Sequence, residues 1–259
     1  VDRSRGLGDV YKRQGRYAKA ISVLSNRSPN LFVEPSWNRY LQIEPFSADP
    51  LNESYQWWNF DVVNIPEALD IIGQEVKPVN VAVLDTGSPY AVDPAFTRSI
   101  FDTQWGWDMV DNDALADDDE FPNGSFSHGT HVGSTISMLN DGLDGNGMAA
   151  RVTPIRVCAS GCPGSATYGA YLYLNGDDND SLTTFAQRSA GQKLHSVNMS
   201  YGGSGGSATS ASCVKLGELA DRGVLIASSS GNSGVGSVGW PSSCPKVYSV
   251  GATNGTDRR

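Results

Sequence analysis

The sequence has no apolar run long enough to span a membrane and no cluster of lysines and arginines. The first absence argues against a membrane partner. The second, with 19 Lys and Arg against 28 Asp and Glu (a formal net charge of -9), argues against a nucleic-acid partner. Histidine is scarce, at 3 residues, and no zinc-protease spacing occurs. What is present is 39% hydrophobic residues in a chain of 259, enough for the core of one large α/β domain.

The first fourteen residues do not resemble part of a folded domain. Residues 4–14 resemble the in-frame translation of a sequencing adapter, so we interpret residues 1–14 as an artefact without structural meaning. We expect the natural N-terminus, with any signal peptide, to lie outside this sequence.

Apolar runs that alternate with helical patterns indicate an α/β fold. The expected strands are the aliphatic runs 81–84, 152–157, 196–200, 224–228 and 247–250. The expected helices are 131–139 and 214–221. This alternation predicts a mostly parallel central sheet with helices on both faces. Ligand sites in such sheets lie beyond the carboxyl ends of the strands.

Three polar residues stand where expected strands end or a helix begins. Asp85 follows the run 81–84, His128 precedes a helix, and Asn232 follows the run 224–228. Each of them alone is more often a cap, a turn or a structural residue. Together they match three groups that nucleophilic acyl transfer uses. These are a carboxylate that orients an imidazole, an imidazole that takes a proton, and an amide that binds an oxyanion.

The motifs around these residues resemble those of the subtilisin-like serine proteases (subtilases), and most of all the thermitase-like secreted members. The resemblance covers residues 50–259 in family order. Its motifs are Asp85-Thr86-Gly87, His128-Gly129-Thr130-His131-Val132, Asn198-Met199-Ser200-Tyr201-Gly202-Gly203, Gly231-Asn232-Ser233-Gly234, Trp240-Pro241-Ser242 and Val250-Gly251-Ala252-Thr253. It implies the three-layer subtilisin-like α/β fold and hydrolysis of peptide bonds by an Asp-His-Ser triad.

The resemblance also implies a role for each matching position. Asp85 becomes the triad carboxylate, His128 the general base and Asn232 the donor of the oxyanion hole, whereas His131 is structural. Two short segments become substrate-binding: the first pairs its backbone with a peptide and the second forms a wall of the specificity pocket. These segments are Ser200, Tyr201 and Gly202, and Ser229, Ser230 and Gly231.

One part of the family pattern is missing. No Gly-Thr-Ser-Met-Ala-x-Pro motif, which carries the nucleophilic serine in the family, occurs in the sequence. We therefore expect residues 49–259 to be a catalytic domain without its C-terminal part, inactive as it stands. One alternative is a subtilase-like pseudoenzyme that acts as a binding module. A remote alternative is an aspartic protease, suggested by Asp85-Thr86-Gly87-Ser88, although such enzymes need two motifs of this kind.

Acidic residues before His128 predict calcium binding. Calcium takes six to eight oxygens from acidic loops, and the loop with Asp108, Asp111 and Asp113 resembles a calcium loop of thermitase-like subtilases. The neighbouring acidic run 117–120 is interpreted as a solvated loop. The resemblance implies a second site, with ligands Asp141, Asp93 and Asp49.

Residues 15–48 resemble the last part of the family's inhibitory propeptide, with cleavage expected between about residues 43 and 49. The expected partners are therefore polypeptide substrates and the protein's own propeptide, and we expect a monomer. The four cysteines fit two disulfides in a secreted protein, although four buried thiols are an alternative and the pairing is left open. The cysteines are Cys158, Cys162, Cys213 and Cys244.

Overall fold

A computed structural model of the chain describes part of the sequence. The described residues are 41–42, 57–72, 75–76, 79–88, 101–118, 128–138, 147–148, 150–177, 193–203, 206–234 and 236–253. Three expectations fall outside them: the adapter-like residues 1–14, almost all of the propeptide-like residues 15–48, and the second calcium site with Asp49, Asp93 and Asp141.

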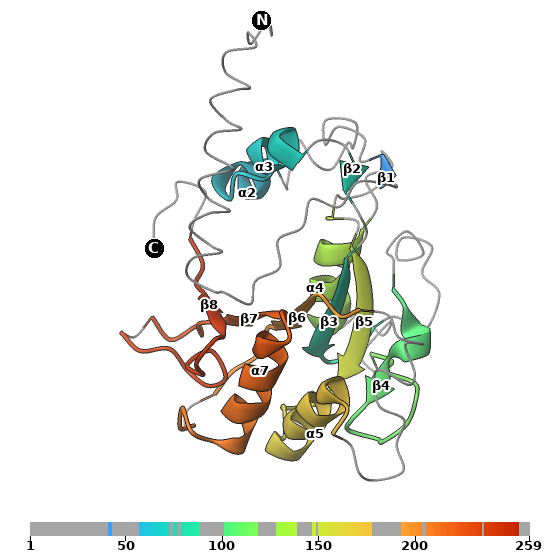
Figure 1. Cartoon of the computed structure of the whole chain (residues 1–259), viewed down its shortest axis with the longest axis vertical. Coiled ribbons are helices and arrows are strands. Elements are labelled where there is room, and N and C mark those ends of the chain that lie inside the picture. Colours follow the sequence, from blue (N-terminus) through green and yellow to red (C-terminus); the bar gives the residue numbers. More distant parts are fainter. Residues whose placement is uncertain are drawn as a thin grey trace, which may run out of the picture.

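A six-stranded sheet with the order β4-β5-β3-β6-β7-β8 forms the centre of the described structure (Figure 1). Every neighbouring pair in it is parallel. The strands are β3 (Asn80–Asp85), β4 (Trp107–Asp108), β5 (Arg151–Arg156), β6 (Ser196–Met199), β7 (Leu225–Ser229) and β8 (Tyr248–Val250). The mostly parallel sheet predicted from the apolar runs is confirmed.

Helices cover both faces of this sheet, so the central strand β3 is buried on both sides. Ala82 and Leu84 belong to one apolar core, which includes residues of α5 (Gly164–Asn175) and α7 (Ala211–Asp221). Val81 and Val83 point to the opposite face and pack with Val132 and Ile136 of α4 (His128–Ser137). The prediction of helices on both faces is therefore confirmed.

The ends of two helices follow from local sequence. Ser210 precedes α7, and its side chain accepts a hydrogen bond from the backbone N–H of Cys213. Helix α5 ends at Asn175, and the following Gly176 has a φ of 78°, a left-handed conformation that suits glycine.

The remaining elements precede β3 or lie beside β4. They are β1 (Leu41–Gln42), α2 (Trp57–Val62), α3 (Ile65–Ile72), β2 (Glu75–Val76) and the 3-10 helix η4 (Thr103–Trp105). β1 and β2 pair in antiparallel fashion. In the part of the chain described, every helix is too short or too polar to cross a membrane.

Candidate active site

Asp85 is the last residue of β3, and its side chain is only 2% exposed. Its backbone carbonyl accepts hydrogen bonds from the N–H groups of Val157 and Cys158, which follow β5. The residue is thus fixed between the carboxyl ends of two parallel strands, where ligand sites of such sheets lie.

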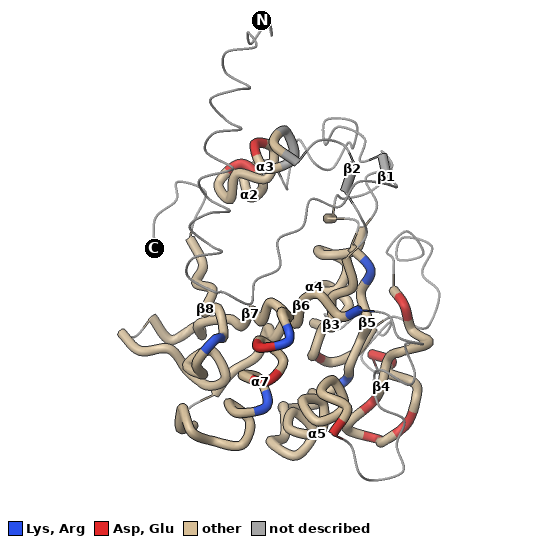
Figure 2. Tube along the Cα trace, viewed as in Figure 1, with Lys and Arg blue, Asp and Glu red and all other residues tan. Residues whose placement is uncertain are grey.

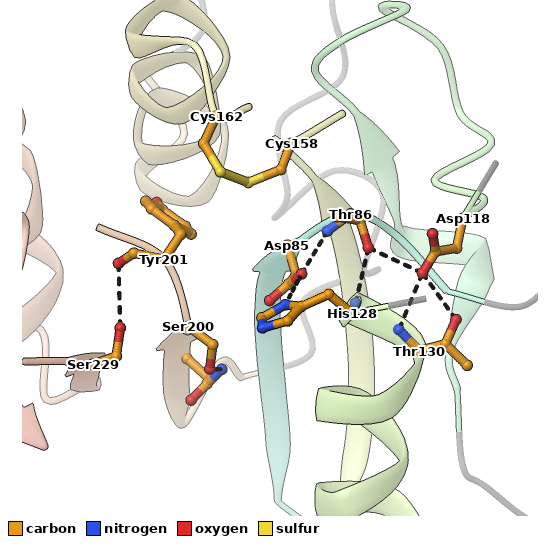
Figure 3. Close-up of polar contacts among 12 residues, drawn as sticks. Asp85, Thr86, Asp118, His128, Thr130, Cys158, Cys162, Ser200, Tyr201 and Ser229 are labelled. Atoms are coloured by element: carbon orange, nitrogen blue, oxygen red, sulfur yellow. Dashed lines mark hydrogen bonds and ion pairs between the residues drawn. A yellow bond between two sulfur atoms is a disulfide. The ribbon is translucent and has the colours of Figure 1, made fainter. Parts of the chain in front are cut away.

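His128 begins α4 and directs its ring at Asp85 (Figure 3). Its Nδ1 lies 2.7 Å from Asp85 Oδ1, an oxygen that also accepts the backbone N–H of Thr86 at 2.8 Å. Burial raises the pKa of Asp85, and the hydrogen bond and the charge of His128 act in the opposite direction. The imidazole is 46% exposed, so one side of the pair is buried and the other is accessible to a substrate.

Two glycines allow α4 to begin this close to the end of β3. A Cβ atom on Gly129 would lie 2.5 Å from the carbonyl oxygen of Gly87, and one on Gly87 would overlap the backbone of Asp117. The φ of Gly87 is also left-handed, at 118°. Gly129 therefore allows α4 to begin beside the end of β3, and Gly87 allows the backbone of Asp117 to pass close to it.

The segments predicted to bind substrate follow the next two strands of the sheet. Ser200 and Tyr201 come directly after β6, and Ser229 ends β7. The Ser229 hydroxyl donates to the Tyr201 carbonyl at 3.4 Å, so the two segments lie side by side, as Figure 3 shows. Asn232 lies on the exposed turn after β7.

Sequence reasoning missed the hydroxyl of Tyr171 behind this region. It lies 2.9 Å from the Tyr201 hydroxyl, and Tyr171 is fully buried in α5. Desolvation raises the pKa of Tyr201, and the nearby Tyr171 and Asp85 raise it further. Both phenols are therefore neutral hydrogen-bonding groups at neutral pH.

Asp118 was also missed. It belongs to the acidic run that the sequence suggests is solvated, yet it is only 4% exposed. Its Oδ2 accepts hydrogen bonds from the Thr86 hydroxyl and from both the N–H and the hydroxyl of Thr130. A run of four acidic residues gives no sign of which one is buried.

The guanidinium group of Arg156 lies beside the acidic loop that is predicted to bind calcium. Arg156 Nη1 lies 2.6 Å from Asp108 Oδ2 and 2.6 Å from Asp111 Oδ2. Asp108 Oδ1 accepts two backbone N–H groups, and Asp113 Oδ1 accepts that of Leu115. Figure 2 shows the acidic residues around β4.

This arrangement does not fit a calcium site. Calcium needs six to eight oxygens directed at one point, whereas these carboxylates are directed at a guanidinium and at backbone N–H groups. Within the described ranges, no three His, Cys, Asp or Glu side chains gather as a metal ion would require.

The structure pairs the cysteines that the sequence left unpaired. One disulfide joins Cys158 to Cys162, and the other joins Cys213 at the start of α7 to Cys244 before β8. The first closes the loop after β5, next to the backbone groups that hold the Asp85 carbonyl.

Comparison with known proteins finds relatives that match most of this chain. The sequence profile described as the Subtilase family matches residues 77–258. Subtilisin Savinase of Lederbergia lenta is 30% identical over 204 residues, which are 78% of this chain and 65% of that protein. The alkaline protease of Alkalihalobacillus alcalophilus is 30% identical over 204 residues, and the match covers 78% of this chain and 46% of the relative.

The alkaline elastase YaB of Bacillus sp. (strain YaB) is 34% identical over 132 residues, 51% of this chain and 32% of that protein. Among solved structures, a protease from Pseudoalteromonas arctica PAMC 21717 superposes with a TM-score of 0.55 at 25% identity, over 69% of this chain and 57% of that one. The chain thus spans about two thirds or less of each of these relatives.

Proposed function

Because this chain belongs to the subtilase family, we propose that it is the larger part of the catalytic domain of a secreted serine endopeptidase. The observation that best supports this proposal is the Asp85–His128 pair, in which a buried carboxylate oxygen lies 2.7 Å from the imidazole Nδ1. A carboxylate held in this way fixes the tautomer of the ring and stabilises the imidazolium that forms during acyl transfer.

In this proposal the hydrolysis uses three groups of the described chain. A serine Oγ from the segment beyond residue 259 attacks the scissile carbonyl, and its proton passes to Nε2 of His128, because Asp85 holds Nδ1. The side chain of Asn232 donates a hydrogen bond to the oxyanion that develops. Subtilisin is the reference case for this amide donor, so the role rests on the family.

Substrate binding is assigned to the segments that follow β6 and β7. The backbone of residues 200–202 would pair with an extended peptide, and residues 229–231 would form a wall of the pocket for the side chain before the scissile bond. The hydrogen bond between Ser229 and Tyr201 supports this assignment, because it fixes the two segments relative to each other.

The test is to express this chain as one polypeptide with the natural sequence that follows residue 259. We expect the extended protein to hydrolyse casein and to lose that activity on treatment with phenylmethylsulfonyl fluoride, which acylates an activated serine in the manner of a substrate. The 259-residue chain is the matched control, and we expect it to be inactive. If the extension carries another residue in place of the serine and casein stays intact, the pseudoenzyme is the correct interpretation.

Secretion and processing are part of the same proposal. The disulfides Cys158–Cys162 and Cys213–Cys244 support an oxidising compartment. We assign residues 15–48 as the remnant of an inhibitory propeptide, which would make the protein a zymogen. We expect the mature enzyme to be a monomer.

Calcium is proposed only for the set Asp49, Asp93 and Asp141, on the strength of the resemblance. We expect EDTA to lower the Tm by about 5–10 °C, since a ligand at 100 times its Kd adds about 2.7 kcal/mol. Asp141→Asn should abolish this shift, and Asp113→Asn should leave it intact. Differential scanning calorimetry with and without EDTA measures both. Loss of the shift in the Asp113→Asn variant would instead place calcium in the loop beside Arg156.

A further inference from the structure

The Asp118 carboxylate connects the two segments that carry Asp85 and His128. Thr86, one of its partners, directly follows Asp85, and Thr130, the other, lies two residues after His128. The hydrogen bonds to Asp118 Oδ2 measure 3.0 Å from the Thr86 hydroxyl, 3.2 Å from the Thr130 N–H and 3.0 Å from the Thr130 hydroxyl.

The same network satisfies the first turn of α4. The first N–H groups of a helix have no partner within it. Here the N–H of Gly129 donates to the Thr86 hydroxyl at 2.8 Å, and that of Thr130 donates to Asp118. A carboxylate at this end of the helix is also favoured by the helix dipole.

Asp118 itself is held by backbone contacts. Its N–H donates to the carbonyl of Ser88 at 2.9 Å, and the N–H of Ser88 donates to the carbonyl of Ala116 at 3.0 Å. The segment 116–118 therefore runs along residues 86–88, directly after the strand that ends in Asp85 (Figure 3). These backbone contacts restrain the Asp118 carboxylate independently of its hydrogen bonds to α4.

We propose that Asp118 is a positioning residue for the triad: it fixes the start of α4 against Thr86 and thereby holds the His128 ring at Asp85. This proposal rests on the proposed protease function. A displacement of about 1 Å at a reacting group can cost on the order of 100-fold in rate. The three hydrogen bonds of Asp118 restrain a displacement of this kind.

The first experiment needs no protease activity. In the 259-residue chain, a His Nδ1 proton held by a carboxylate gives a proton NMR signal at very low field. We expect this signal in the wild type and in Asp221→Ala, which removes an exposed carboxylate at the end of α7. It should be weakened in Asp118→Asn and lost in Asp118→Ala. An unchanged signal in folded Asp118→Ala would overturn the proposal even if the protein proves to be no protease.

The second experiment measures kinetics in the extended protein. Asp118→Ala should lower kcat by about 10–100-fold and leave KM within about twofold, because the network includes none of the residues proposed to bind substrate. Asp118→Asn, which keeps an acceptor oxygen, should recover part of the loss. Thr130→Val should lower kcat and Thr130→Ser should restore it, which keeps the test valid if the Asp118 variants fail to fold. An increase in KM with unchanged kcat would contradict a positioning role.

Discussion

Replacement of Arg156 by methionine is expected to lower the free energy of unfolding by about 3–5 kcal/mol. The Arg156 side chain is 5% exposed, and its more buried partner Asp108 is 1% exposed. Methionine fills much of the same space but leaves the Asp108 carboxylate buried without its cation. Most of the expected loss comes from that uncompensated charge, rather than from the net stability of the ion pair.

Urea denaturation of the 259-residue chain, with both disulfides intact, measures this effect. Asp111→Asn is the matched control. Asp111 accepts from the same Nη1 at 2.6 Å but is 62% exposed, so we expect a cost below about 1 kcal/mol. The double variant Asp108→Asn/Arg156→Met should be less destabilised than the sum of its single changes. A cost below about 1 kcal/mol for Arg156→Met would show that solvent reaches Asp108 and compensates its charge.

His128→Ala in the extended protein is expected to lower kcat by about 10⁴–10⁶-fold, the range that loss of a triad member produces in subtilisin itself. The alanine removes the only described group within hydrogen-bond distance of Asp85 Oδ1 that can take a proton from a serine. Asp85 would keep its bond from the Thr86 N–H, so the fold around β3 should persist.

His131→Ala provides the comparison within the same helix. His131 lies on the exposed side of α4, and we expect its loss to change kcat little. Steady-state hydrolysis of a chromogenic peptide, with circular dichroism to verify folding, distinguishes the two variants. If His128→Ala retained a tenth of the wild-type kcat, the assignment of the general base would be wrong.

Strand β3 was predictable because it contains a continuous aliphatic run buried on both faces, whereas the two-residue strand β4 has no such run. The expected run 81–84 lies within β3, and the run 224–228 differs from β7 by one residue at each end. Helix α5 could not be predicted in the same way. Its buried face includes the polar residues Thr167 and Asn175, so its sequence contains no clear apolar stripe with helical period.

The site was predictable where it depends on motifs and unpredictable where it depends on distant contacts. Asp85 and His128, 43 residues apart, stand in motifs that determine their relative position. Arg156 lies 48 residues beyond Asp108, in an apolar strand whose sequence gives no sign of an acidic partner. Spacing of carboxylates alone therefore suggested calcium where the fold provides a guanidinium.

The parallel topology around β3 also has a consequence for how the chain folds. One neighbour of β3 in the sheet is β6, and the hydrogen bond between Asn80 and His195 beside them closes a separation of 115 residues. The entropy of such a loop must be overcome before the contact gives any stabilisation, so folding of this topology is slow. During synthesis, β3 emerges from the ribosome well before either β5 or β6. Its aliphatic edge therefore stays unpaired in the meantime, and refolding yields should fall as protein concentration rises.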